Sequence, residues 1–215
     1  MTDFASPRDF TELADALRRA TPLSRIIAGG TDLVLSLQRG ETPDLLIDIT
    51  HVAGLGDVRL DGGTVRVGAL ATFGQLQTHP VLVAHAPCLA HAAGRVGSLQ
   101  IRNSATIGGN VANASPCGDS LPALIALGAQ VEVLEASGKV TSRPLGELLV
   151  GQRRTGLRAS ECITAFHFPA LGADQRSGFA KIGARTTVTI SKLSAAAVVD
   201  VDATSGLLGN ARVAL

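Results

Sequence analysis

Residues 26–35 read IIAGGTDLVL, and far along the chain a second glycine pair occurs where residues 105–113 read ATIGGNVAN. In the first stretch an apolar strand pattern leads into two glycines, and a threonine and an aspartate then precede an apolar helix pattern. Glycines in such a turn let consecutive backbone N–H groups face one point, and the following helix N-terminus favours an anion there. The first stretch therefore has the context of a phosphate-binding loop. The second has the glycines, with a weaker indication of a helix after them.

Neither glycine pair is decisive alone, because most such pairs are ordinary turns. The motifs GxGxxG and GxxxxGK(S/T) do not occur in the sequence, which excludes the standard Rossmann and P-loop phosphate sites. Two phosphate-binding loops in separate parts of one chain fit a diphosphate held between two subdomains. The pair of loops thus favours a dinucleotide cofactor more than either loop does.

The composition excludes several classes of protein. The net charge is only +1 and the chain has no Trp or Tyr, so it lacks the basic field and stacking platforms that nucleic-acid binding uses. No apolar run reaches the length of a membrane span and no signal peptide is visible, so we expect a cytoplasmic protein. The three cysteines form no CxxC pair and the five histidines show no tight spacing, so no metal site is expected.

Periodicity predicts a small parallel α/β unit over roughly the first 50 residues. A helix is expected from Pro7, followed by a strand at 24–30, a helix at 31–40 and a strand at 44–50. Thr31 or Asp32 is placed to cap the second helix.

Further along the chain, glycine-containing turns predict two hairpins, at 57–70 and 130–143, and an apolar run predicts a strand at 161–169. Helices are expected near 72–78 and 86–96, and another from Ser120 onward. Residues 97–119 are rich in Gly, Asn and Ser without sustained periodicity, so we interpret them as one long functional loop. Residues 171–178 are typical of a linker, and strand, loop, strand, turn and strand follow it.

Two polar positions in the 97–119 segment admit more than one interpretation. Asp119 precedes an apolar helix pattern, so it is either the N-cap of that helix or a ligand-binding residue. Cys117 has no base near it in the sequence, which favours a small packing residue over a nucleophile.

Three segments carry a resemblance to a known family: AGGTDL at 28–33, QIRNSATIGGNVANASPCGDSLPAL at 100–124 and GFAKIGARTTVTISKLSAAA at 178–197. In this order they resemble the FAD-binding (medium) subunits of the molybdenum hydroxylases. That family includes the medium subunits of carbon monoxide dehydrogenases and the FAD domain of xanthine dehydrogenase. The resemblance extends along essentially the whole chain, and the two glycine loops are its most specific motifs.

The resemblance implies an α+β fold with FAD between two subdomains, of the type found in vanillyl-alcohol oxidase. The FAD-binding domain would occupy residues 1–172, with subdomains of about 1–55 and 56–172, and residues 173–215 would begin a C-terminal antiparallel-sheet domain. Family members continue beyond this point, and the final NARVAL lies within an apolar strand pattern. On these grounds the chain is expected to be C-terminally truncated.

The resemblance also implies which residues contact FAD, and it implies no catalytic acid or base on this chain. The first loop would hold the diphosphate, and the second would approach the diphosphate and the flavin side. Asp119 would bind the ribose or adenine end, Ile163 would touch the cofactor, and Lys181 would lie beside the isoalloxazine. The full set is Ala28, Gly29, Gly30, Thr31, Asp32, Leu33, Thr106, Ile107, Gly108, Gly109, Asn110, Asp119, Ile163 and Lys181.

The function implied is that of an FAD-dependent oxidoreductase component that transfers electrons. A molybdenum-cofactor large subunit would oxidise the substrate, and a small iron–sulfur (2Fe–2S) subunit would relay electrons to FAD. The flavin would then reduce an acceptor such as NAD or a quinone. Two alternatives stay open: a stand-alone flavin oxidoreductase of the same fold, and a non-catalytic nucleotide-binding module.

Overall fold

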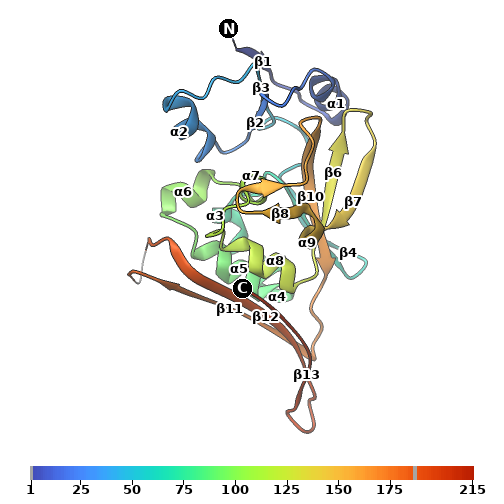
Figure 1. Ribbon diagram of the computed structural model, residues 1–215. Coiled ribbons are helices and arrows are strands. Elements are labelled where there is room, and N and C mark those ends of the chain that lie inside the picture. The colour runs from blue at the N-terminus through green and yellow to red at the C-terminus, as the bar shows by residue number, and fades with distance from the viewer. Residues whose placement is uncertain (1, 186–187) are drawn as a thin grey trace.

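The computed structural model describes residues 2–185 and 188–215 of the chain. In Figure 1 the N-terminal elements lie at the top, a group of helices and a sheet lie in the middle, and the last strands run along the bottom. Within the described residues, no helix combines the length and hydropathy needed to cross a membrane.

The N-terminal unit is a three-stranded parallel sheet with two helices. Its strands β1 (Asp3–Ala5), β2 (Arg25–Ile27) and β3 (Leu45–Asp48) have the order β1-β3-β2. Helix α1 (Phe10–Arg18) and helix α2 (Leu33–Gln38) connect them. Because parallel strands need a crossover connection, this order of elements follows from the alternation of strand and helix patterns. The predicted α/β unit is confirmed, with β1 as an additional strand.

Helix α1 begins later than the sequence indicates. Asp9 is its N-cap, with the side chain accepting a hydrogen bond from the N–H of Glu12, so the prediction that Pro7 is the first helical residue is wrong. Aspartate is a favoured N-cap residue, because its carboxylate accepts a hydrogen bond from an otherwise unpaired N–H group of the first helical turn. Leu13 and Leu17 then fall on the buried side of the helix.

The middle of the molecule contains a five-stranded antiparallel sheet in the order β4-β5-β10-β6-β7. Both predicted hairpins and the predicted strand at its centre are confirmed. The strands are β4 (Val58–Asp61), β5 (Thr64–Gly68), β6 (Gln130–Glu135), β7 (Val140–Pro144) and β10 (Glu161–Pro169).

The remaining elements of this middle region are short helices and one small hairpin (Figure 1). They are α3 (Phe73–Leu76), α4 (Pro80–His85), α5 (Pro87–Gly94), α6 (Leu99–Ser104), α7 (Ile107–Asn113), α8 (Ser120–Ala126), α9 (Leu145–Leu148), β8 (Leu149–Gly151) and β9 (Arg154–Thr155).

The interpretation of residues 97–119 as one long loop is wrong, because the segment contains α6 and α7. Each of these helices is started by a side-chain cap. The Ser98 hydroxyl accepts from the N–H of Ile101, and the Thr106 hydroxyl accepts from the N–H of Gly109. The second glycine pair is therefore the first turn of a helix rather than a turn before one.

The C-terminal strands β11 (Gln175–Gly183), β12 (Ser191–Val201) and β13 (Leu208–Ala214) form an antiparallel sheet in that order. One face of this sheet packs on α5 and α8 through buried side chains that include Phe179 and Val198. The predicted succession of strands is confirmed, although the linker is shorter than expected since β11 already begins at Gln175.

Candidate cofactor site

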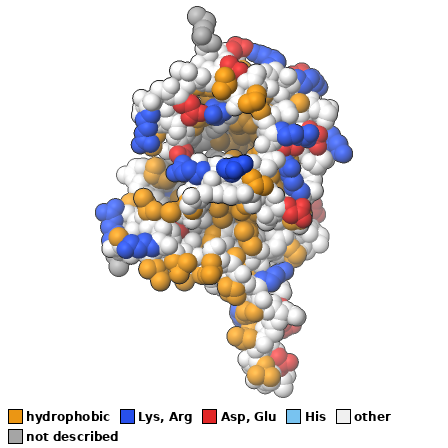
Figure 2. Space-filling view, in the orientation of Figure 1, with side chains coloured by type: hydrophobic (Ala, Val, Ile, Leu, Met, Phe, Trp, Pro, Cys, Tyr) orange, Lys and Arg blue, Asp and Glu red, His pale blue; other side chains and the backbone are white. Residues whose placement is uncertain are grey.

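The two glycine segments line one cleft of about 490 Å³. Its walls come from the N-terminal unit on one side and from α7 and the β8–β9 hairpin on the other, and Figure 2 shows this face of the molecule hollowed there. The predicted site residues that line it are Ala28, Gly29, Gly30, Thr31, Asp32, Leu33, Thr106, Gly109 and Asn110. Two segments that are distant in sequence thus share one site.

The first glycine loop leaves a row of backbone donors unused. Within the described residues, the N–H groups of residues 29–33 donate to no protein acceptor. Gly30 has φ +68°, a left-handed conformation that lets the chain turn from β2 into α2. Unpaired N–H groups at the start of a helix favour a negatively charged ligand.

The two loops touch through their backbones. A Cβ placed on Gly29 would lie only 1.8 Å from the carbonyl oxygen of Ser104, at the end of α6. A second link joins side chains, since the Asn113 amide at the end of α7 donates to the Asp32 carboxylate. Asp32 occupies the N-cap position of α2, but its side chain caps nothing and makes this contact instead.

The second glycine pair has a different role from the first. The N–H groups of Ile107 and Gly108 donate to the carbonyls of Ala71 and Ala69, and the N–H of Gly109 donates to its own cap. A Cβ on Gly108 would lie 2.7 Å from the Cβ of Ala69, so this glycine allows α7 to approach the chain segment beneath it. Ile107 and Gly108 are buried, whereas Gly109 lines the cleft. The first-turn N–H groups of the second pair thus already have protein acceptors, unlike those of the first loop in the described ranges.

The wall opposite the first loop was not found from the sequence. It is formed by residues 153–161, in and after the small β8–β9 hairpin. Glu161 is buried there and accepts from Arg143 Nη2 at 2.9 Å and from the N–H of Arg158 at 2.8 Å. Burial alone would raise the pKa of Glu161, but these hydrogen bonds outweigh it and hold the pKa below its usual value. The turn signal in GQRRTG was the one local cue to this wall.

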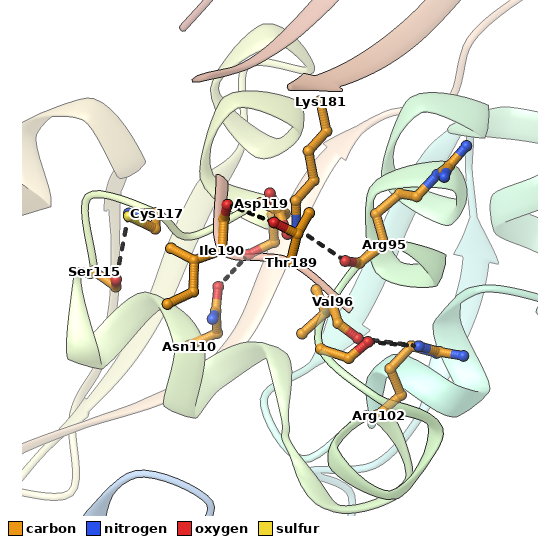
Figure 3. A network of polar contacts seen from close by, with 12 residues as sticks. Arg95, Val96, Arg102, Asn110, Ser115, Cys117, Asp119, Lys181, Thr189 and Ile190 are labelled. Carbon is orange, nitrogen blue, oxygen red and sulfur yellow. Dashed lines mark hydrogen bonds and ion pairs between the residues drawn. The ribbon is translucent and has the colours of Figure 1, made fainter. Parts of the chain in front are cut away.

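Asp119 and Lys181 lie apart from this cleft and bind each other (Figure 3). Lys181 Nζ is 2.5 Å from Asp119 Oδ2, both side chains are less than 10% exposed, and Nζ also donates to the carbonyl of Arg95. Burial raises the pKa of the Asp119 carboxyl, and the Lys181 ammonium opposes that shift. Asp119 occupies the N-cap position of α8, as one interpretation expected, but its side chain makes no cap hydrogen bond and pairs with Lys181 instead.

Lys181 lines a second cavity of about 800 Å³ together with Arg95, Gly97, Arg102 and residues of the loop after β11. The other oxygen of Asp119, Oδ1, is buried and has no hydrogen-bond partner in the described part of the chain. The Ser191 hydroxyl is also buried without a hydrogen-bond partner within the described residues, and it contributes to lowering the pKa of the Asp119 carboxyl.

Of the other candidate residues, Ile163 lies in the core and Cys117 does not. Ile163 is 5% exposed in β10, opposite Val133 of β6. Burial raises the pKa of the neighbouring Cys162 thiol to about 12, which leaves it protonated and unreactive. Cys117 is half-buried in the turn before α8, where its N–H donates to the hydroxyl of Ser115.

Comparison with known proteins gives consistent matches. Residues 1–171 match the family model described as the FAD binding domain in molybdopterin dehydrogenase. The chain is 37% identical over 205 residues to the nicotinate dehydrogenase FAD-subunit of Eubacterium barkeri, covering 93% of this chain and 69% of that protein. It is 32% identical over 202 residues to the xanthine dehydrogenase FAD-binding subunit of Escherichia coli O157:H7, covering 92% and 69%.

Comparison with solved structures also supports this family. The structure superposes on carbon monoxide dehydrogenase from Hydrogenophaga pseudoflava with a TM-score of 0.89 at 26% identity, covering 99% of this chain and 73% of that chain. The resemblance drawn from the three sequence segments is thereby confirmed. The chain belongs to the family of FAD-binding (medium) subunits of the molybdenum hydroxylases, and it is an oxidoreductase component whose cofactor is FAD.

Proposed function

We propose that this chain transfers electrons within a molybdenum hydroxylase complex, from the iron–sulfur clusters of a partner subunit to an external acceptor such as NAD or a quinone. When bound, FAD supplies a redox centre that exchanges electrons singly or in pairs. The observation that carries the proposal is the single cleft lined by both glycine segments. A cofactor held between two structural units is positioned by both of them.

The residues of the cleft fit the diphosphate of FAD. The unused N–H groups of residues 29–33 are donors for phosphate oxygens, and the absence of a side chain on Gly29 keeps the two loops in contact. In this assignment Ala28 to Leu33 hold the diphosphate, and Gly109 and Asn110 face it from the other wall. Thr106, Ile107 and Gly108 act indirectly, because they fix where α7 lies.

The resemblance implies Asp119 at the ribose or adenine end of FAD and Lys181 beside the isoalloxazine. The two side chains form one ion pair, so we assign both to the same part of the cofactor, on the flavin side. The buried ammonium of Lys181 stabilises negative charge near the Asp119 carboxylate. Ile163, which is buried in β10, is assigned a packing contact only.

We also propose the domain division drawn from the sequence: an FAD-binding domain of the vanillyl-alcohol oxidase type at 1–172, with subdomains of about 1–55 and 56–172, and a second domain at 173–215. Two separate clusters of buried side chains support the subdomain boundary. One of them is built mainly from residues 13–55. The other contains the middle region and the inner face of the last sheet.

The proposed partners are a large subunit with the molybdenum cofactor and a small 2Fe–2S subunit. The chain has three cysteines, of which Cys88 and Cys162 are buried, and none is spaced for a cluster. The proposal therefore assigns no cluster ligand to these cysteines and places the clusters in the small subunit.

A visible spectrum of the purified chain tests FAD binding, and the complex tests electron transfer. We expect flavin bands that survive desalting and bleach with dithionite, and co-purification with one larger and one smaller subunit. A colourless protein that cannot be reconstituted with FAD would contradict the cofactor assignment. Flavin that stays oxidised when the substrate reduces the clusters of the complete complex would contradict the electron-transfer role alone.

A further inference from the structure

Most charged side chains of the glycine cleft are already paired with each other. Arg25 Nε is 2.5 Å from Glu41 Oε1, and Arg158 Nη2 is 2.8 Å from Glu161 Oε1. Arg153 also lines the cleft, and its guanidinium forms no ion pair or hydrogen bond with any residue in the ranges 2–185 and 188–215. Among the three arginines that line the cleft, it is thus the one without a protein partner in the described ranges.

The backbone fixes the position of Arg153 in the wall of the cleft. It lies in the turn between β8 and β9 with φ +52°, and its N–H donates to the carbonyl of Ala114 at 2.9 Å. Ala114 is the C-cap of α7, the helix that carries the second glycine pair, and β9 packs against the same helix. Figure 1 shows this small hairpin lying over α7. The turn is therefore anchored to a wall of the cleft.

A diphosphate bound in the cleft would need a positively charged side chain near the first glycine loop. Three arginines and three carboxylates line it, so they cancel, and residues 28–33 contain Asp32 but no Lys or Arg. A diphosphate that bound through backbone N–H groups alone would lie near the Asp32 carboxylate without a compensating charge. The planar fork of a guanidinium matches phosphate oxygens better than an ammonium does.

We propose that Arg153 pairs with the diphosphate of FAD and positions it against the first glycine loop. The inference rests on the proposed function, since it assigns a further residue to the same site. It adds an element that neither glycine motif contains, supplied by a separate hairpin on the opposite wall of the cleft.

The test compares two adjacent arginines. Arg153→Asn removes the cation while keeping a residue type that tolerates positive φ, and Arg154→Gln removes an exposed arginine that is not part of the cleft lining. FAD is titrated into each apo-protein and binding is followed by flavin fluorescence, with ADP as a competitor. At about 50 mM salt we expect Arg153→Asn to raise the Kd for FAD and for ADP about tenfold or more. At about 0.5 M salt we expect the Kd values of the wild type and Arg153→Asn to lie closer together, because salt screens the charges. Arg154→Gln should bind FAD with the wild-type Kd.

The possible outcomes separate the two proposals. Wild-type protein that fails to bind FAD would overturn both the proposed function and the role of Arg153. Equal Kd values for wild type and Arg153→Asn, or equal losses in the two variants, would overturn the role of Arg153 only. Arg153→Gly, which favours the same left-handed turn, must reproduce the loss seen with Asn, and Arg153→Lys must recover part of the affinity.

Discussion

Replacing Gly29 by alanine tests how closely the two cofactor loops approach each other. The new Cβ would lie 1.8 Å from the carbonyl oxygen of Ser104 and 2.6 Å from its carbonyl carbon. These are backbone atoms at the end of α6, so no side-chain rotation relieves the overlap. To reach an ordinary contact of 3.4 Å, the loops must separate by about 1.6 Å.

The magnitude follows from the cost of overpacking. Forcing an extra methyl group into a filled contact costs about 1–3 kcal/mol. In the free variant the loops can separate and so relieve the overlap. FAD binding brings the loops together again, so the free energy of the overlap then reduces the binding free energy of FAD. The Kd for FAD then rises by about 5- to 150-fold, since 1.4 kcal/mol corresponds to a factor of ten. Helix and sheet content stays unchanged, because the cores of the two units are not altered.

The assay is a titration of apo-protein with FAD, together with the flavin content after desalting. The chain has no Trp or Tyr, so protein concentration is best taken from amino-acid analysis, and flavin absorbance is read without aromatic background. Gly146→Ala is the matched control, since a Cβ there meets no atom within 4 Å. Wild-type affinity in Gly29→Ala would refute the contact between the loops, and an equal loss in Gly146→Ala would show that the effect is not local.

Three further predictions follow from the site. Gly30→Val and Gly109→Val should each lose FAD on desalting while circular dichroism is preserved, because Gly30 has φ +68° and Gly109 lines the cleft; full flavin content in both variants would contradict the assignment. The lowered pKa of Glu161 means that its ionised form contributes stability above about pH 4.3, the unfolded value, and that this is lost as pH falls through the folded pKa. Urea unfolding of Glu161→Gln should therefore depend less on pH in that acidic range, and an unchanged dependence would exclude this role. Lys181→Met leaves the buried Asp119 carboxylate unpaired and should lower the free energy of unfolding by about 3 kcal/mol or more, with part recovered in the double variant that adds Asp119→Asn; no loss in the single variant would contradict the buried ion pair.

The sequence predicts the N-terminal unit and the hairpins well, since their signals are local. Alternation of strand and helix patterns indicates the parallel unit, and glycine turns indicate both hairpins. It fails at residues 97–119, where α6 and α7 are too short to show helical periodicity. Their starting signals, Ser98 and Thr106, are visible in the sequence, but two glycines in the first turn of α7 conceal the second helix.

The site was predicted in part, and the limits have physical causes. The two loops carry family motifs, so the resemblance alone assigns both of them to one FAD site. The ion pair between Asp119 and Lys181 joins residues 62 positions apart, and no local pattern reports such a contact. The wall around Arg153 has no motif, because a lone arginine in a hairpin turn resembles any exposed turn residue.

All first-turn N–H groups of α7 donate to protein acceptors, whereas those of the first glycine loop do not in the described part of the chain. The residues of the site therefore fall into two classes. At Ile107 and Gly108 the backbone N–H groups serve the fold, so substitutions there act on protein abundance and thermal tolerance before they act on the cofactor. At residues 29–33 the N–H groups serve no other group within the described residues, so substitutions there alter cofactor loading in a chain that still folds. A library of single substitutions scored separately for folded protein and for bound flavin would therefore separate two glycine motifs that look equivalent in the sequence.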